Sequence, residues 1–421
     1  GFAWDAAVVL TAVTRGTRVT NDALPPGAWT GAIKAVDTSG NYSSAAATFN
    51  ITVANFNEVI TTATEDPKWL GLFPCFGDDY ALRLGLDSRE AHTGGNNGSH
   101  VNAAGLLVKD AGSGARFDHS GAGAARGLLS EAAATNLCLR SEELDQAPWN
   151  TSNVTITADA TTAPDGTATM DKVVETAVTN QHLAYQLIAF AASTRYRFSM
   201  FVKAAERSQF PLLVNGAGSS ATYSALFDTA TETFTFPDTA PQAQGYDSLP
   251  NGIYRIWFEQ TTDGSGGSSN FQPGLAKNGV RVYAGTAGEG GYMWGAQVEA
   301  VNNVSGGDRS SYIATAASTV ARTVDGHSTT LSSIPRLKTP VDGSVIVRAR
   351  IDRASTDMSR RLWQIDDGTA NNLVRIVITS GTTVFAVILN GGISIASAIA
   401  GAIAAGQEFT VALCWHRNNF A

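Results

Sequence analysis

The chain has few cysteines, few charged residues and no long apolar run. Its 421 residues include three cysteines, Cys75, Cys138 and Cys414, which are far apart and show no CxxC or Cys/His spacing. We therefore expect neither disulfides nor structural zinc. The apolar run at residues 393–405 is shorter than the roughly 20 residues that cross a bilayer, so no membrane insertion is expected. No signal peptide is visible at Gly1, and we interpret the chain as a segment of a longer polypeptide.

Basic charge is also scarce. The chain has 29 Lys and Arg against 37 Asp and Glu, a formal net charge of -8 and a pI near 5.3. Because phosphate binding needs a concentrated basic face, we expect no nucleic-acid partner. Charged residues make up only 16% of the chain while it has 42 glycines, which favours many short strands and tight turns over long helices.

Four regions differ in pattern. Residues 1–54 end in GAWTGAIKAVDTSGNYSSAAATFNITV, which looks like the last strands of a fibronectin type III sandwich. A turn-rich connecting region follows at 55–123. Residues 124–325 contain apolar and aromatic runs with period-two alternation, separated by Gly, Asn, Pro and Asp, which predicts an antiparallel jelly-roll sandwich. Residues 326–421 repeat the strand pattern and resemble an incomplete laminin G or concanavalin-A-like sandwich. The expected fold class is all-β, a string of β-sandwich domains.

Catalytic patterns are absent from the sequence. The six histidines stand in no metal-binding or nucleophile motif. Neighbouring carboxylates occur at 78–79, 142–143 and 366–367, but adjacent residues of a strand point to opposite faces and cannot flank one glycosidic bond. Turn formation explains Asp366 and Asp367. We expect no enzymatic activity.

A structural calcium ion is the one cofactor that the sequence leaves open. Asp165, Asp171 and Asp228 are predicted to supply loop oxygens, which a hard cation prefers. No DxDxDG motif is present, so a metal-free turn is the favoured interpretation and no cofactor is expected.

Glycan recognition is the best-supported chemistry. In the run YRIWFEQ, alternation places Trp257 beside Arg255 and Glu259 on the more polar face, a mixture of ring and charge that suits sugar binding. The alternative for these three residues is burial beneath a loop or in a subunit interface. In GYMWGAQVEA, the same alternation predicts a buried Trp294 and places Gln297 and Glu299 on the wet face.

Five ordered segments carry a resemblance to a known family. They are residues 126–149, 164–166, 196–204, 251–260 and 291–325, with sequences such as RGLLSEAAATNLCLRSEELDQAPW and SSYIATAASTVARTVD. Together they resemble the carbohydrate-binding-module-like domain of tail fibre and tail tip proteins of tailed bacteriophages. The similarity covers about half the chain, and Arg116, Phe117 and Asp118 match an Arg-Phe-Asp element that often precedes this domain.

The resemblance implies a role in host attachment. Such a protein is a component of the phage tail, acts outside the cell, contacts host surface polysaccharide and other tail proteins, and is usually a homotrimer. A fibronectin-like domain before the module is similar to the distal part of tail hub proteins. The alternatives are a purely structural spacer or decoration domain of the virion, a bacterial adhesin, or an accessory segment of a polysaccharide-degrading enzyme, because a fold does not fix a function.

Overall fold

The computed structural model describes most of the chain after residue 90. The described residues are 27–33, 47–53, 91–216, 218, 221–301, 310–328, 343–351, 360–379, 383–404, 408–416 and 419–420. The chain divides into two compact units, Gly1–Gly71 and Leu72–Ala421. In the first unit, β1 (Gly27–Ile33) pairs antiparallel with β2 (Ala47–Val53). The rest of the predicted fibronectin-like sandwich lies outside the described residues.

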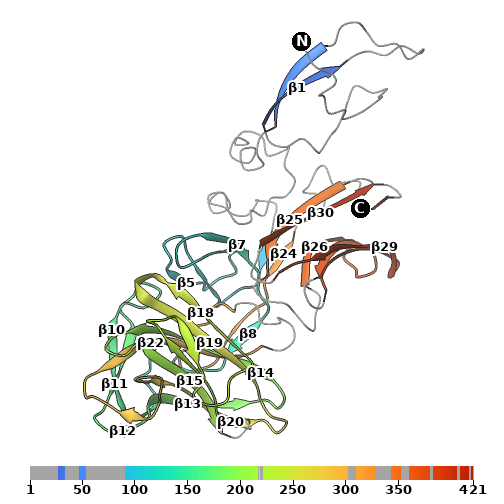
Figure 1. The fold of residues 1–421 in the computed structure, drawn as a ribbon. Coiled ribbons are helices and arrows are strands. Elements are labelled where there is room, and N and C mark those ends of the chain that lie inside the picture. Colours follow the sequence, from blue (N-terminus) through green and yellow to red (C-terminus); the bar gives the residue numbers. More distant parts are fainter. Residues whose placement is uncertain are drawn as a thin grey trace, which may run out of the picture. The chain divides into compact units, whose positions relative to one another are not determined.

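The larger unit contains a sandwich of two six-stranded sheets (Figure 1). The first, here the β19 sheet, has the order β10 (Val154–Thr161), β11 (Met170–Glu175), β22 (Gly290–Ala300), β14 (Arg195–Ala204), β19 (Ile253–Thr261) and β18 (Ala243–Leu249). The second, here the β13 sheet, has the order β17 (Thr233–Thr235), β16 (Tyr223–Asp228), β15 (Gln209–Gly216), β20 (Gly267–Leu275), β13 (His182–Phe190) and β9 (Asn150–Ser152). Neighbouring strands in both sheets are antiparallel, as the alternation predicts.

Alternate residues of the two sheets meet in one apolar core. Phe198 and Phe258 stack with ring centroids 4.7 Å apart, and Phe271 from the other sheet lies 5.6 Å from Phe198. All three rings are at most 1% exposed. Burying such side chains supplies the main stabilisation of a sandwich, about 1.5 to 3 kcal/mol for each large apolar group.

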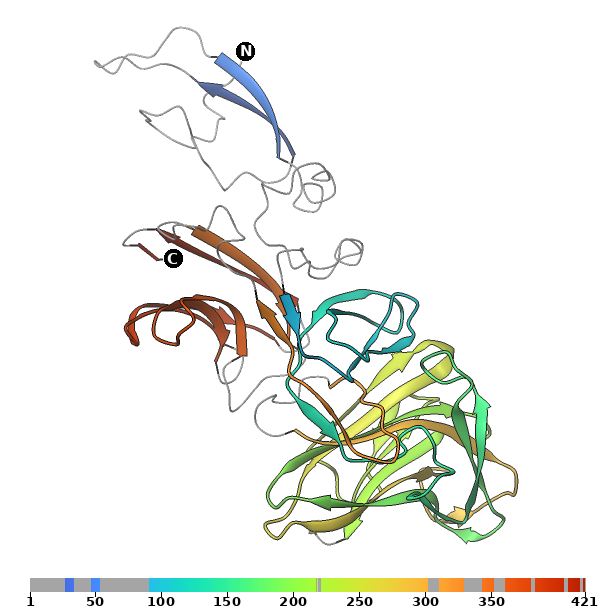
Figure 2. The same ribbon diagram turned by 180° about the vertical axis from the view of Figure 1, so that it is seen from behind.

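Within the described part of residues 91–328, ten further short strands lie outside the two six-stranded sheets. They are β3 (Ala91–Thr93), β4 (Ser99–Val101), β5 (Leu107–Lys109), β6 (Arg116–His119), β7 (Ala125–Leu129), β8 (Ala134–Asn136), β12 (Thr179–Asn180), β21 (Tyr283–Ala284), β23 (Val320–Arg322) and β24 (Gly326–Ser328). Hairpins β4–β5 and β6–β7 lie beside β18 (Figures 1 and 2). A Cβ on Gly121 would come 2.1 Å from the Ser248 carbonyl oxygen, so the second hairpin touches this end of the sheet.

The chain enters and leaves this sandwich at one place. Strand β3 pairs antiparallel with β24, with Thr93 opposite Gly326 and Ala91 opposite Ser328. Strand β8 likewise pairs with β23. Residues 91–328 therefore form one domain whose two ends are joined by hydrogen bonds.

The C-terminal strands form two smaller sheets. One has the order β25 (Gly343–Arg350), β30 (Glu408–His416) and β31 (Asn419–Phe420), and the other β26 (Arg360–Asp366), β27 (Leu373–Ile378), β28 (Thr383–Asn390) and β29 (Ile393–Ala402). Both contribute to one core that includes Val347, Ile376 and Leu413. Strand β29 ends the four-stranded sheet and carries exposed Ile393, Ile395 and Ile399.

The all-β prediction is confirmed. Within the described residues the helical structure is a single three-residue turn, η3 (Pro250–Gly252). None of the helical structure described is long and apolar enough to span a membrane. The predicted boundaries at 54, 123 and 325 stay predictions, and the structure adds that residues 91–123 pack onto the sandwich that follows them.

Candidate functional site

The three residues predicted to bind glycan lie on one face of β19. Ile256 and Phe258 point into the core between the sheets, so Arg255, Trp257 and Glu259 face away from it, as alternation predicted. Here the β19 sheet's outer surface is called the covered face. It consists of Arg197 on β14, Arg255, Trp257 and Glu259 on β19, and Gln297 and Glu299 on β22.

Glu259 is engaged by two arginines. It is 1% exposed, and its carboxylate pairs with Arg197 at 2.6 Å and with Arg195 at 2.8 Å. The Arg197 guanidinium lies 4.7 Å from the centre of the Trp257 ring, within the range of a cation–π contact. Trp257 is half-buried, and its ring lies over Gly245 of β18, where a Cβ would be 2.5 Å from Cζ2. Glu259 thus orients Arg197, and Arg197 covers part of the indole.

Part of this face lies beneath the segment 310–313. Arg255 donates to the Ser310 carbonyl oxygen at 2.5 Å, and Ser310 Oγ donates to Glu299 at 2.7 Å. Gln297 accepts from the Ile313 amide at 2.7 Å. The expectation that Gln297 and Glu299 are wet was wrong, since they are 0% and 1% exposed. Alternation identifies the face of a strand but gives no information about a distant segment that packs over it.

Trp294 is fully buried, as predicted, but in a different core from the one that alternation implied. Gly295 has φ +65°, and the register between β14 and β22 shifts at this point. The bulge puts Trp294 with Phe201 and Tyr312, while Ala296 and Val298 join the core between the sheets. A bulge adds one residue to a strand and so reverses the faces beyond it.

A cluster of buried charges fastens the hairpins over the covered face. Arg116 donates to Glu131 at 2.6 Å and to Asp325 at 2.5 Å, and Arg322 pairs with Glu131 at 3.2 Å. All four side chains are at most 4% exposed. We call these four residues the Arg116 cluster. Arg116 begins the Arg-Phe-Asp element of the sequence, so this position of the element has a structural role.

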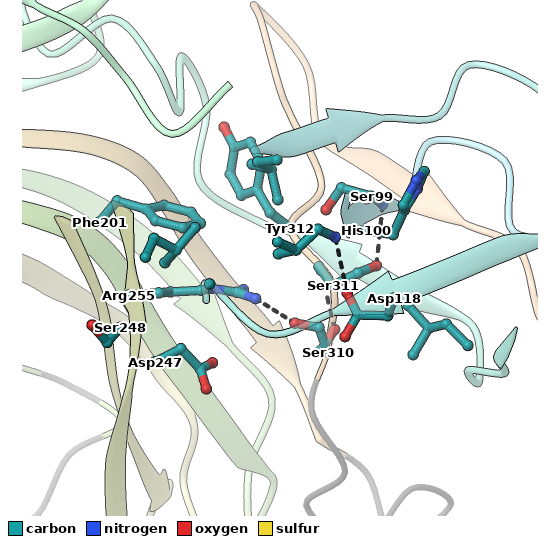
Figure 3. A pocket seen from close by; sticks show the side chains of 15 residues that line it. Ser99, His100, Asp118, Phe201, Asp247, Ser248, Arg255, Ser310, Ser311 and Tyr312 are labelled. Atoms are coloured by element: carbon teal, nitrogen blue, oxygen red, sulfur yellow. Dashed lines mark hydrogen bonds between the residues drawn. The ribbon is translucent and has the colours of Figure 1, made fainter. Parts of the chain in front are cut away.

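The Arg255 pocket lies where the hairpins meet β18 and β19 (Figure 3). Its cavity volume is about 50 Å³. Its lining comprises Ser99, His100, Val101, Leu107, Asp118, Gly121, Leu129, Phe201, Asp247, Ser248, Leu249, Arg255, Ser310, Ser311 and Tyr312. Figure 3 shows Asp247 beside Arg255 on the sheet side and Asp118 on the hairpin side. The pocket therefore combines one of the predicted residues with groups that no sequence pattern connected to it.

Burial shifts the ionisation of two pocket residues. It lowers the pKa of the Arg255 guanidinium, although Glu299 and Asp247 act in the opposite direction. It raises the pKa of Asp118, which accepts the Val101 amide at 2.8 Å and lies 3.6 Å from Arg126. His100 is held by Asp110 at 2.9 Å. These are polar groups that a low-dielectric wall makes strong hydrogen-bonding partners.

The outer surface of the β13 sheet has a different character, and sequence reasoning missed it. We call Tyr185, Leu187, Asn215, Asn270 and Gln272 the open face. Leu187 is 64% exposed and lies opposite Asn270, which lies opposite Asn215. Gln272 donates to Asn215 at 2.6 Å. Alternation along HLAYQLIAF places Tyr185 and Leu187 together, and this was the signal that could have found the site.

Tyr185 is the aromatic group of the open face. Its side chain is half-buried, and within the described residues it has neither a hydrogen bond nor a ring or cation contact. The amide of Asn270 is half-buried and likewise has no hydrogen-bond partner in the part of the chain that the structure describes. The open face thus offers a ring and uncharged amides to a ligand.

The three aspartates considered for calcium binding accept hydrogen bonds from groups of the protein and do not share one site. Asp165 accepts the Thr167 amide and pairs with Lys109 at 3.0 Å. Asp171 accepts two backbone amides, and Asp228 accepts Gln209 and the Ala230 amide. Among the described residues no group of three or more His, Cys, Asp or Glu is placed to hold a metal.

The acidic pairs considered for catalysis have separate partners. Glu142 pairs with Lys109, and Glu143 pairs with Arg140. Asp366 and Asp367 accept amides of their own turn, as predicted from the sequence. Asp78 and Asp79 lie outside the described residues.

Comparisons with known proteins give little more. No family model matches the chain, and no curated protein matches it. Among solved structures, TmCBM61, determined in complex with β-1,4-galactotriose, is similar over 34% of this chain and 99% of its own, with 15% identity and a TM-score of 0.18. A likeness at this level carries no argument about this chain. We therefore base the function on the geometry of the surfaces described above.

Proposed function

We propose that residues 91–328 are a glycan-binding domain that attaches its parent protein to a polysaccharide surface. The observation that carries the proposal is the open face. Aromatic rings stack on the apolar faces of pyranose rings, and neighbouring amides hydrogen-bond the hydroxyls. Tyr185 supplies a ring without a protein partner in the described residues, and Asn270, Asn215 and Gln272 supply amides beside it.

The lack of charge on the open face favours a neutral polysaccharide. Its five residues carry no formal charge, whereas the charged groups of the covered face are largely paired with one another. Glycan contact by Trp257, Arg255 and Glu259 stays a prediction, with Trp257 as the half-exposed member of the three.

The first and last strands of the domain are paired with each other. This favours a domain that presents a binding surface over one that acts as a spacer. A spacer in series admits the chain at one end and releases it at the other. Here β3 and β24 are hydrogen-bonded to each other, so the chain returns to where it entered. This arrangement suits a domain that projects from its parent protein and presents a surface.

The proposal includes the setting implied by the sequence resemblance. We place the domain in a tail tip or tail fibre protein of a tailed bacteriophage, where it acts outside the cell, against host surface polysaccharide and next to other tail proteins. Homotrimer formation belongs to the same proposal, since three weak sites on one particle act together. The exposed isoleucines of β29 would supply apolar contact area between copies. Native mass measurement that gives only monomer would contradict the trimer.

The test is binding of the full chain to an array of bacterial polysaccharides and to whole bacterial cells. We expect Tyr185→Ala to weaken binding about tenfold, which corresponds to about 1.4 kcal/mol. Tyr292→Ala is the matched control, because Tyr292 is also a half-buried strand tyrosine but lies on β22 near Lys203. Equal binding by the wild type and Tyr185→Ala would overturn the assignment of the site. A folded chain that binds no glycan would overturn the function.

A further inference from the structure

We propose that the open face binds an internal stretch of a linear polysaccharide whose chain runs across the strands, from β9 over β13 and β20 to β15. The proposal rests on the glycan-binding function proposed above. It adds the direction of the bound chain and the part of the chain that is recognised.

The register of the sheet lines up the exposed groups of this face across four strands. Asn150 of β9 lies opposite Tyr185 of β13, and the pairing of β13 with β20 puts Gln272 on the other side of Tyr185. Residues opposite each other on neighbouring strands point to the same face of a sheet. The next row of the face consists of Leu187, Asn270 and Asn215.

These two rows form a patch that is longer across the strands than along them. Neighbouring strands lie about 4.8 Å apart, so the distance from β9 to β15 is about 14 Å. The two rows are two residues apart along each strand, which is about 7 Å. One sugar unit of an extended polysaccharide is about as long as one strand spacing, so roughly three units fit across the four strands.

An ion pair closes the open face at one end of its strands. Arg281 donates to Gln181 Oε1 at 3.1 Å and pairs with Asp238 at 2.7 Å. Gln181 lies just before β13, and the Asp238 amide donates to Ser224 Oγ on β16 at 3.2 Å. We call these contacts the Arg281 bridge, which reaches from the start of β13 to β16.

Beside the Arg281 bridge the outer surface of the sheet is no longer exposed. Leu183 and Leu213 point to the same side as Tyr185 and lie next to Arg281, yet they are only 7% and 1% exposed. Tyr185 is the next outward-facing residue after Leu183 on β13. A ligand chain that ran along β13 from Tyr185 would therefore meet the bridge, and so would a branch on that side. A linear chain that crosses the strands lies alongside the bridge.

The open edge of the sheet favours an internal stretch of chain over a chain end. Strand β9 is the last strand of the sheet, and Asn150 is exposed there. Its amide donates to the Pro148 carbonyl oxygen at 3.0 Å, which orients the side chain. A polysaccharide that stacks on Tyr185 can continue past Asn150 into solvent.

The experiment is calorimetric titration of the full chain with linear fragments of neutral glucans, galactans, mannans and xylans, one to six units long. Asn150→Ala removes an amide from the row that crosses the strands. Ser268→Ala is the matched control, because Ser268 is also an exposed strand residue, but it lies two residues beyond Asn270 along β20.

We expect affinity to rise with fragment length up to about three units and then to level off. Asn150→Ala should weaken binding of fragments of that length about fivefold, which corresponds to about 1 kcal/mol, and Ser268→Ala should leave it unchanged. Chemical reduction of the terminal sugar of a six-unit fragment should not change its affinity, because a chain end is not recognised.

Three results would overturn the proposed direction and binding mode: unchanged binding by Asn150→Ala, an equal or larger loss in Ser268→Ala, or loss of binding when the terminal sugar is reduced. If Tyr185→Ala still weakens binding in any of these cases, the glycan-binding function stands and the proposal of this section alone is lost. A folded wild-type chain that binds no fragment and no polysaccharide would overturn both.

Discussion

The two outer faces of the 91–328 sandwich share one core but have different surroundings. The covered face carries Arg197, Glu259 and Glu299, and much of it lies under hairpins and the segment 310–313. The open face carries Tyr185 and uncharged amides and faces solvent at Leu187. Charge thus lies where the protein packs on itself, and the ring without a protein partner lies where a ligand can reach it. A mixed aromatic and charged strand is therefore an ambiguous sign of a binding site.

The largest expected effect is a loss of stability when the Arg116 cluster over the covered face is disrupted. Arg116→Ala leaves Glu131 and Asp325 as buried carboxylates with one fewer partner, and removing one member of a buried ion pair costs about 3 to 5 kcal/mol. Urea unfolding should show this loss, and hydrogen exchange should show faster exchange in residues 91–131. Arg348→Ala is the control, since its pair with Glu408 is exposed and worth at most about 1 kcal/mol. Equal losses of unfolding free energy in the two variants would show that the Arg116 cluster does not stabilise the packing of residues 91–131.

The next effect concerns pH. Burial raises the pKa of Asp171 on β11 from 3.8 to about 6, and nearby Asp145 and Asp159 act in the same direction. The fold therefore favours the protonated carboxyl. Its stabilising contribution is complete below about pH 4 and is lost as the pH rises through about 6. At about 1.4 kcal/mol for each pKa unit, the loss is at most about 3 kcal/mol.

Thermal unfolding of the wild type and Asp171→Asn from pH 4 to pH 7.5 measures this contribution. We expect the wild type to lose stability relative to the variant as the pH rises, because asparagine does not titrate. Parallel curves for the two proteins would show that Asp171 titrates normally.

Binding variants sharpen the comparison between the faces. Tyr185→Ala should weaken polysaccharide binding about tenfold with little change in stability, because its ring is half-exposed and has no partner in the described residues. Trp257→Ala should instead lower the free energy of unfolding by about 1 to 2 kcal/mol, through loss of the Arg197 contact and of packing. Calorimetric titration and thermal unfolding of both variants separate the two effects. Weaker glycan binding by Trp257→Ala, with unchanged binding by Tyr185→Ala, would instead place the glycan site at Trp257.

The smallest expected effect is at Gly245. A Cβ at this position would lie 2.5 Å from Trp257 Cζ2, so Gly245→Ala must move the indole away from Arg197. An alanine in a strand regains about 0.5 to 1 kcal/mol relative to glycine, so the net change in stability should stay within about 1 kcal/mol. Tryptophan fluorescence should report the moved ring. An unchanged spectrum, with Gly264→Ala as the control in open space, would show that the ring does not lie over Gly245.

The sequence determined the strands and their local faces. Alternation predicted that Ile256 and Phe258 oppose Trp257, because side chains repeat every two residues along a strand. Trp294 is buried as predicted, but not on the face that it was predicted to share with Ala296 and Val298. The absence of long apolar runs and of charge-rich helical patterns likewise determined the all-β class.

Tertiary structure decided which faces are wet and which residues form sites. Gly295 reverses the alternation within β22, a local backbone event that no composition indicates. The covering of Gln297 and Glu299 depends on residues 310–313. Arg255 and Asp118 line one pocket although more than a hundred residues separate them in sequence. Side-chain direction is a property of one strand, whereas solvent exposure and pocket formation depend on what distant segments pack against it. This is why the sequence predicted the sandwich but not the open face at Tyr185.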